Sequence, residues 1–251
     1  MKMLEITSLT KRFFGYKAVN NVSTEVRKGE ILALIGPNGS GKTTLFNCIT
    51  GFLQPDTGSI HFNGVEITDN APYKISRLGI ARTFQLVRIF PALNVLENML
   101  IAIQDHQERS FFSRIIRSPR VRQNEKLAKE KALDLLSFVG LEDLQNEYAK
   151  NLSYGQRKLL TFVLAMMPEP DLVLLDEPAA AVNPTMIKHI KQYIRDLNNL
   201  GTTIFLIEHN MDVVMDLADR IIVLDYGSII AEGKPEEIKE NEKVIEAYFG
   251  H

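Results

Sequence analysis

The feature that most constrains this chain is a glycine-rich octapeptide that follows an apolar run. The apolar run is Ile31–Ile35, residues 44–49 have helical spacing, and between them the chain reads Gly36-Pro37-Asn38-Gly39-Ser40-Gly41-Lys42-Thr43. Glycines let the backbone curl until its N–H groups point inward and form a concave anion site. The start of the following helix adds the positive end of its dipole. The pattern predicts a phosphate-binding loop, with Lys42 at the outer phosphates and the Thr43 hydroxyl as a ligand of Mg²⁺.

Two acidic residues close a second apolar run. Residues 172–175 read Leu-Val-Leu-Leu and are followed by Asp176 and Glu177, which predicts a buried strand ending in two carboxylates. Next to a phosphate loop, Asp176 is expected to hold Mg²⁺ through water. Glu177 is expected to face a water in line with the terminal phosphate and to act as its general base. The alternative is that both acids begin an exposed loop.

A third motif is Leu152-Ser153-Tyr154-Gly155-Gln156, which precedes a helical pattern. Ser153 is a suitable helix N-cap, and a small polar residue with a glycine at a helix start predicts a second anion site. An ordinary helix cap is the alternative. Because the first loop already suffices for one nucleotide, an economical geometry places this motif over the nucleotide of a second molecule.

Composition limits the class of protein. Across 251 residues, 29 basic and 31 acidic side chains give a net charge of −2, and 45% of residues are hydrophobic. These values exclude a disordered or fibrous chain and argue against a nucleic-acid partner. Cys48 is the sole cysteine, so no intramolecular disulfide can form and a reducing compartment is expected. No apolar run reaches the roughly 20 residues of a membrane span, and we expect a cytosolic chain or one held at the cytosolic face.

Hydrophobic periodicity divides the chain into an α/β core and a helical insertion. We expect strands at 4–8, 22–26, 31–35, 172–175, 203–207 and 221–224, a hairpin turn at Tyr226-Gly227, and a final helix over 236–249. Residues 95–167 have mainly helical spacing. The predicted division is a core of residues 1–92 with 168–251, and a helical subdomain of residues 93–167.

Taken with Thr83-Phe84-Gln85 and Glu208-His209, these motifs resemble the nucleotide-binding subunit of ABC transporters over essentially the whole chain. The resemblance implies a P-loop NTPase fold, with a mainly parallel sheet, an antiparallel N-terminal β subdomain and an inserted helical subdomain. It implies ATP and Mg²⁺ as cofactors and hydrolysis between two protomers. The ATP-binding residues that it implies are Phe13, Gly36, Pro37, Asn38, Gly39, Ser40, Gly41, Lys42, Thr43 and Thr44.

The resemblance also assigns the remaining roles. Glu177, His209 and Gln85 are the catalytic residues, with His209 at the terminal phosphate and Gln85 at Mg²⁺ beside Thr43 and Asp176. Ser153, Gly155 and Gln156 clamp the partner's nucleotide, and Asn183 lies in the loop that joins the two sites. Two positions depart from the family: Tyr154 replaces a glycine, and Asn183 stands where many relatives have aspartate. Phe13 matches the family's aromatic residue that stacks on adenine, and Phe14 and Tyr16 are close enough in the chain to take that role instead.

Longer segments narrow the resemblance to one subgroup. IGPNGSGKTTLFNCITGFLQPDTGSI, RTFQ, DEPAAAVNP, IEHNMDVVM, IIAEGKPEEI and the terminal EAYFG are similar to ATPase subunits of branched-chain amino acid importers. This implies a bacterial or archaeal protein on the cytoplasmic face of the inner membrane. Its partners would be two permease subunits, a second ATPase subunit and an extracytoplasmic solute-binding protein.

Other functions stay open at this stage. They are an importer of urea or other amides, an exporter motor of the same fold, a soluble ABC-type ATPase and a P-loop kinase. The arginine-rich segment 108–122 is also open: it is a solvated helical face, or a surface close to anionic head groups or to the membrane partner.

Overall fold

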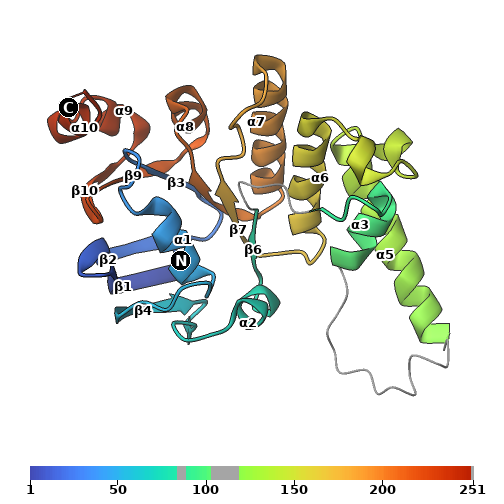
Figure 1. Ribbon diagram of the computed structural model, residues 1–251, viewed down its shortest axis with the longest axis horizontal. Helices are drawn as coiled ribbons and strands as arrows, with labels where there is room; N and C mark the ends of the chain where they lie inside the picture. Colours follow the sequence, from blue (N-terminus) through green and yellow to red (C-terminus); the bar gives the residue numbers. More distant parts are fainter. Residues whose placement is uncertain (84–88, 103–118, 250–251) are drawn as a thin grey trace. The chain divides into compact units, whose positions relative to one another are not determined.

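The computed structural model describes residues 1–83, 89–102 and 119–249, with the backbone alone at 119–122 and 249. The chain forms two compact units (Figure 1). One unit comprises Met1–Gln85 and Pro170–His251, and the other comprises Leu86–Glu169.

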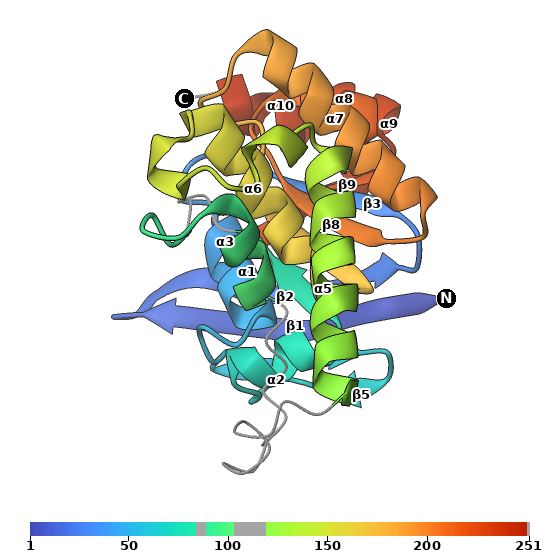
Figure 2. The ribbon, with the colours of Figure 1, turned by 90° about the vertical axis from the view of Figure 1, so that its right-hand side faces the viewer.

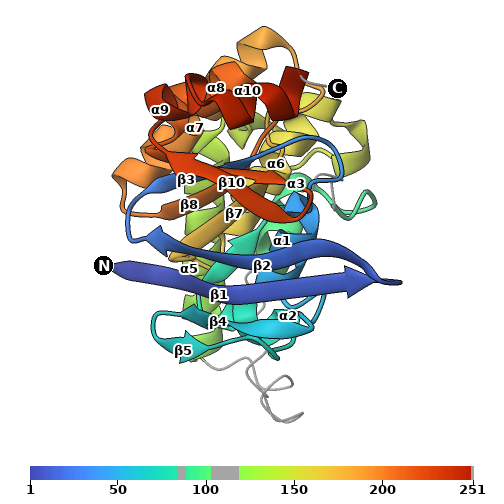
Figure 3. The ribbon, with the colours of Figure 1, turned by 90° about the vertical axis from the view of Figure 1, so that its left-hand side faces the viewer.

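The first unit begins with an antiparallel sheet in the order β2-β1-β4-β5 (Figure 3). Its strands are β1 Lys2–Phe13, β2 Tyr16–Arg27, β4 Thr57–Phe62 and β5 Val65–Glu66. β1 and β2 are longer than the predicted strands at 4–8 and 22–26. Both strands continue through mixed polar and apolar residues, where Leu9 and Val19 are fully buried. The apolar pattern therefore detects only part of each strand.

A second sheet, of six strands, has the order β10-β9-β3-β8-β7-β6. Its strands are β3 Ile31–Ile35, β6 Ile80–Arg82, β7 Leu172–Asp176, β8 Thr203–Ile207, β9 Arg220–Asp225 and β10 Ser228–Gly233. All neighbours in it pair in parallel except β10, which is antiparallel to β9 across the predicted Tyr226-Gly227 turn. The expected α/β architecture, with a mainly parallel sheet and an antiparallel N-terminal sheet, is confirmed.

The central strand β3 is buried on both faces, and alternate residues serve two different cores. Leu32 and Leu34 pack into a cluster that includes Phe46 of helix α1 (Lys42–Ile49) and residues of the antiparallel sheet, so α1 lies between the two sheets. Ala33 and Ile35 face the opposite cluster, which is covered by α8 (Met211–Leu217), α9 (Pro235–Lys239) and α10 (Glu242–Phe249). This two-sided burial explains why the strand reads as a continuous apolar run.

Two further helices complete the first unit: α2 Pro72–Arg77 and α7 Pro184–Asn199. The prediction of one final helix over 236–249 is wrong, because the chain breaks between α9 and α10. Asn241 lies at the break, and its Oδ1 accepts the N–H groups of Lys243 at 3.1 Å and Val244 at 3.4 Å. An asparagine that caps a new helix start ends the continuous helical pattern.

The second unit is helical in its described part (Figure 2). It contains α3 Val95–Ala102, α5 Pro119–Phe138 and α6 Tyr154–Met166, which pack on one another, and short 3₁₀ turns at Glu142–Leu144 and Ala149–Asn151. Among the described residues, no helix is both long and apolar enough to cross a membrane.

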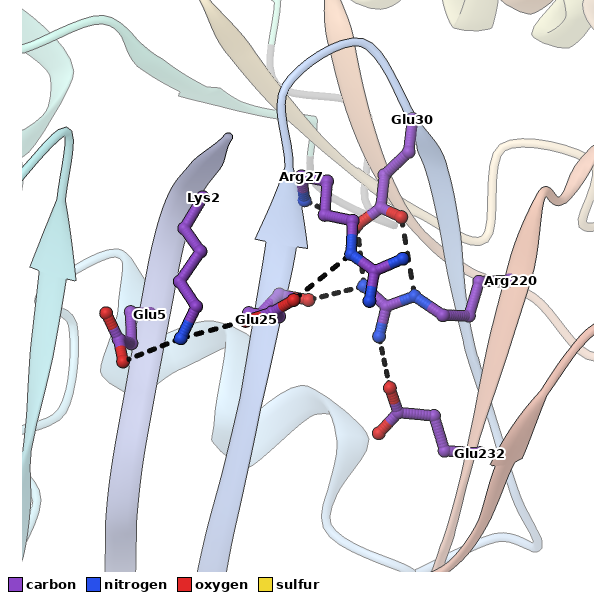
Figure 4. A network of polar contacts seen from close by, with 7 residues as sticks. All are labelled: Lys2, Glu5, Glu25, Arg27, Glu30, Arg220 and Glu232. Atoms are coloured by element: carbon purple, nitrogen blue, oxygen red, sulfur yellow. Dashed lines mark hydrogen bonds and ion pairs between the residues drawn. The ribbon is translucent and has the colours of Figure 1, made fainter.

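A polar network joins the two sheets of the first unit (Figure 4). Arg220 of β9 has a side chain that is 11% exposed, and its Nη2 lies 2.7 Å from Glu30 Oε1 and 2.6 Å from the Glu25 carbonyl of β2. Its Nη1 pairs with Glu232 of β10. One guanidinium therefore satisfies acceptors on both sheets, which its rigid five-donor fork makes possible.

Candidate nucleotide site

The glycine-rich loop joins β3 to α1, and two of its glycines fit against neighbouring strands. Gly41 has φ of 106°, and a Cβ there would lie 2.0 Å from the Ala18 carbonyl oxygen of β2. At Gly36, φ is 152° and a Cβ would lie 2.0 Å from the Leu224 carbonyl oxygen of β9. Side chains cannot occupy either position, so glycine is required by both conformation and space.

Lys42 is the first residue of α1 and is 6% exposed. Its Nζ donates to the carbonyls of Gly36 at 2.9 Å and Pro37 at 2.8 Å, and lies 3.3 Å from Ser40 Oγ. Burial lowers the pKa of this ammonium, and the charges of Glu177 and Asp176 oppose that shift. The ammonium is held by neutral carbonyl oxygens of its own loop, and an anionic ligand would be a stronger acceptor for it than these carbonyls.

The rest of the loop faces outward. Asn38, Gly39 and Thr43 are exposed, Thr44 is half-buried, and the space around a Cβ at Gly39 is open. The loop therefore offers backbone N–H groups, an ammonium and a hydroxyl at the start of a helix, which is the donor set that polyphosphate needs. These residues fit the phosphates of a nucleoside triphosphate.

Glu177 and His209, the described residues predicted to be catalytic, follow strands β7 and β8. β8 is the neighbour of β3 and β7 is the neighbour of β8, so the residues after these parallel strands reach the same edge of the sheet. Asp176 ends β7 and is buried, and Glu177 follows it with φ of 51°. The Glu177 N–H donates to the Ile207 carbonyl of β8 at 2.9 Å. The alternative prediction, that both acids begin an exposed loop, is wrong, because Asp176 is buried in β7 and the Glu177 backbone is bonded to β8.

His209 and Glu177 are in direct contact. His209 Nε2 lies 3.0 Å from Glu177 Oε1, with side-chain exposures of 37% and 19%. The imidazole is therefore in place to orient the carboxylate at the mouth of the site. Among described residues, no group of three or more His, Cys, Asp or Glu side chains is arranged to hold a metal. Mg²⁺ commonly binds through one or two protein groups together with substrate phosphates, and Asp176 and Thr43 can supply such groups.

Phe13, the predicted adenine contact, ends β1 opposite Tyr16 and is 39% exposed. Lys11 Nζ lies 5.8 Å from its ring centroid. Phe14 at the hairpin tip is fully exposed, with φ of 47°. All three aromatic residues of this hairpin are accessible, so the geometry does not choose among them.

The Ser153 motif lies at the start of α6 in the second unit. Ser153 Oγ accepts the Gln156 N–H at 3.3 Å, and Gln156 Oε1 accepts the Ser153 N–H at 2.9 Å, a reciprocal capping box. Gly155 lies in the first turn of α6. Tyr154, between Ser153 and Gly155, is 43% exposed. Ser153 therefore caps helix α6, as the helix-cap alternative predicts.

Asn183, the predicted inter-site residue, caps α7. Its Oδ1 accepts the Met186 N–H at 2.8 Å, so an amide at this position serves the helix start as an aspartate would. Gln85 and most of segment 108–122 lie outside the described residues, and the predictions for them are not examined by the structure.

Two residues of this edge were not assigned roles from the sequence. Arg82 ends β6, and its Nη2 lies 2.8 Å from Asp176 Oδ2. Glu208 is 2% exposed and accepts the Ala179 N–H at 2.7 Å through Oε1. Its Oε2 accepts the N–H groups of His209 at 3.1 Å and Asn210 at 3.2 Å. In both cases the sequence shows a charged residue next to apolar residues, which is the signal that could have marked it. The sequence does not show which residue it contacts, because that depends on the order of the strands in the sheet.

Comparison with known proteins identifies the family of this chain. An ABC transporter family profile matches residues 19–180, and a branched-chain amino acid ATP-binding cassette transporter profile matches residues 228–251. The chain is 43% identical to the high-affinity branched-chain amino acid transport ATP-binding protein LivG of Salmonella typhimurium, over 99% of this chain and 98% of that protein.

Solved structures give the same picture. The ADP conformation of an ATP-binding cassette of an ABC transporter is similar, with a TM-score of 0.87, 36% identity and full coverage of both chains. A dimeric post-hydrolysis cassette bound to ADP and Pi has a TM-score of 0.78 and 26% identity, over 93% of this chain and 99% of that one.

Proposed function

The chain belongs to the ABC transporter family of ATPases, and on that premise we propose that it powers an importer of branched-chain amino acids. The observation that carries the substrate class is the match of residues 228–251 to the branched-chain amino acid cassette profile. The full-length similarity to LivG supports the same assignment. Family membership already implies nucleotide binding; that the nucleotide is ATP with Mg²⁺ is part of the proposal.

In this proposal the loop from Gly36 to Thr43 holds the phosphates. Lys42 exchanges its carbonyl partners at 2.8–2.9 Å for phosphate oxygens, which are charged and therefore stronger acceptors. Thr43 and Asp176 would hold Mg²⁺, which when bound neutralises charge that develops on the phosphates. Gln85 would contribute beside them.

Glu177 supplies the general base. Its carboxylate accepts a proton from the attacking water, while His209 Nε2, 3.0 Å from Oε1, keeps it oriented. Glu208 fixes the main chain on both sides of this pair, since it binds the N–H groups of Ala179 and His209. Catalysis then rests on positioning and charge stabilisation.

The proposal includes a working dimer, formed with a second copy or a related ATPase subunit. The Ser153 motif would meet the partner's nucleotide, and Asn183 would lie between the two sites. The relative that forms a dimer bound to ADP and Pi supports the dimer in this proposal. The helical residues 93–167 are proposed as the signature-bearing subdomain, and residues 1–92 with 168–251 as the ATPase core. The remaining proposed partners are two permeases and an extracytoplasmic solute-binding protein, and the proposed location is the cytoplasmic membrane face.

The catalytic part is tested with Glu177→Gln. This variant should bind ATP with unchanged affinity, dimerise in sedimentation at high concentration, and lose about 10²–10⁴-fold in turnover. Unchanged hydrolysis would remove Glu177 from its role, and a persistent monomer with ATP bound, in the presence of the membrane partners, would refute the shared site.

The transport part is tested by purification from native membranes. Recovery of two permeases, and ATPase activity stimulated by a binding protein loaded with leucine, isoleucine or valine, would support the substrate class. Stimulation by urea or short amides instead would reassign the substrate and leave the ATPase assignment intact.

A further inference from the structure

The proposed metal-binding carboxylate, Asp176, is part of a buried ion pair. Arg82 Nη2 and Asp176 Oδ2 are 2.8 Å apart, and their side chains are 5% and 6% exposed. Arg82 ends β6 and Asp176 ends the adjacent strand β7. The next residue after Arg82 adds a second link, because Thr83 Oγ1 accepts the Asp176 N–H at 3.3 Å.

The other side of the same guanidinium is bound to helix α1. Arg82 Nη1 lies 2.7 Å from Asn47 Oδ1 and 3.2 Å from Thr50 Oγ1, and the guanidinium carbon lies 5.6 Å from the Phe46 ring centroid. The Thr50 hydroxyl is itself fixed, since it donates to the Phe46 carbonyl at 2.7 Å. Arg82 thus spans from the end of β7 to the helix whose first turn contains Lys42 and Thr43.

Stability alone does not account for a charged pair in this place. Removing two charges from water is costly, and well-packed apolar residues often serve as well or better in a buried position. A guanidinium offers something that apolar packing lacks, namely a planar fork that fixes the separation of the groups it joins. Here those groups are Asp176, Asn47 of α1, and Thr50 at the C-terminal cap of α1.

We propose that Arg82 is a positioning residue for Mg²⁺: it holds the Asp176 carboxylate at a set distance from α1, so that Asp176 and Thr43 can bind the same ion. The inference rests on the proposed function, in which this site binds Mg²⁺ with ATP. Oδ2 of Asp176 is held by Arg82, so Oδ1 would be the carboxylate oxygen offered to Mg²⁺ when it is bound. Loss of groups that orient a metal ligand typically weakens metal binding by about 10–100-fold.

The sign of the effect separates positioning from simple electrostatics. Arg82→Met keeps an unbranched stem and removes the positive charge. By Coulomb attraction alone, a carboxylate freed from a neighbouring cation would bind Mg²⁺ more tightly. If Arg82 positions Asp176, metal binding becomes weaker instead. Arg82→Lys keeps the charge without the fork, so it should also weaken binding, by a smaller factor.

The test uses the full-length chain, with Mn²⁺ as a spectroscopic stand-in for Mg²⁺. Free Mn²⁺ is titrated by electron paramagnetic resonance in the presence of ATP at 4 °C, and ATP affinity without metal is measured separately in EDTA. We expect Arg82→Met to raise the Mn²⁺ midpoint about 10–100-fold, while metal-free ATP affinity stays within about twofold.

The matched control is Arg220→Met, which removes another buried, ion-paired arginine of the same unit. Arg220 starts β9 and pairs with Leu32 of β3, whereas the loop follows the other end of β3. It should destabilise the fold in urea but leave the Mn²⁺ midpoint unchanged. An unshifted or tighter midpoint in both Arg82 variants would overturn the proposal, and Arg82→Lys alone decides it if Arg82→Met does not fold. A wild-type chain that binds no ATP would instead refute the proposed function, and this inference with it.

Discussion

Replacing Glu208 by glutamine removes one charge and one acceptor from a carboxylate that is 2% exposed. The wild-type carboxylate accepts three backbone N–H groups, from Ala179 through Oε1 and from His209 and Asn210 through Oε2. Glutamine has a single acceptor oxygen, so its NH₂ group must face at least one of these donors. The orientation that keeps two of the three bonds turns the NH₂ group toward Ala179.

The expected loss follows from this geometry. A hydrogen bond to a charged group is worth about 1.5–3 kcal/mol, and an unsatisfied buried donor costs about 1–3 kcal/mol. Because the remaining two bonds also weaken when the acceptor loses its charge, we expect the free energy of unfolding to fall by about 2–4 kcal/mol. The released segment begins two residues after Glu177, so kcat should fall about 10–100-fold with little change in KM for ATP.

Urea unfolding at pH 7 measures the stability loss, and steady-state hydrolysis measures the split between kcat and KM. Glu232→Gln is the control, because Glu232 is also paired, with Arg220, but lies at a 37%-exposed position of β10. It should lose at most about 1 kcal/mol and no activity. A Glu208→Gln protein within about 0.5 kcal/mol of wild type, or one that is destabilised yet fully active, would refute the reasoning.

Three further predictions concern the same unit. Lys42→Ala should weaken ATP binding about 100-fold or more in calorimetry, because the proposed charge-assisted bonding of the ammonium to the phosphates is lost; retained micromolar affinity would contradict the phosphate-loop assignment. Gly41→Ala should lower the free energy of unfolding by about 2–4 kcal/mol, since its Cβ would lie 2.0 Å from a β2 carbonyl oxygen. Gly39→Ala, at φ of 81° but in open space, should lose about 1–2 kcal/mol, and equal losses would argue against the clash. Lys191 and a neighbouring arginine lower the pKa of Asp216, at a 38%-exposed position. Asp216 therefore stabilises the fold above the unfolded-state pKa of about 3.9, and this stabilisation is lost as the pH falls through the lower folded-state pKa. Asp216→Asn should be about 0.2–1 kcal/mol less stable at pH 7, and a difference that persists undiminished at pH 2–3 would contradict this.

Much of the fold could be predicted because the central strands are buried on both faces. In runs such as Ile31–Ile35 and Thr203–Ile207, polar and apolar residues do not alternate, so the ends of the strand are clear from the sequence. The predicted bounds agree with β3 and β8. The ends of the chain were harder. The break at Asn241 depends on one side-chain cap within an otherwise helical pattern, and a cap overrides periodicity only locally.

The contacts behind the site were beyond sequence reasoning for a different reason. Asp176 and Glu177 can be found from their own apolar run, whereas the partner of Asp176 is 94 residues away in the chain. Arg82 meets it only because β6 is paired with β7, and that pairing is a property of the whole sheet. Glu208 is similar, since its acceptor role requires the residues after β7 and β8 to lie side by side.

The strand residues that pack against the phosphate loop limit which substitutions this protein can accept. Ala18 and Leu224 approach Gly41 and Gly36 with main-chain carbonyl oxygens, so what they contribute is shape that does not depend on side-chain chemistry. Ala18 and Leu224 are both buried and Leu224 also packs in the core, so a replacement must fill the same space and keep its strand in register. At Gly41 and Gly36 the carbonyl contacts leave no room for any side chain, so these two positions cannot vary.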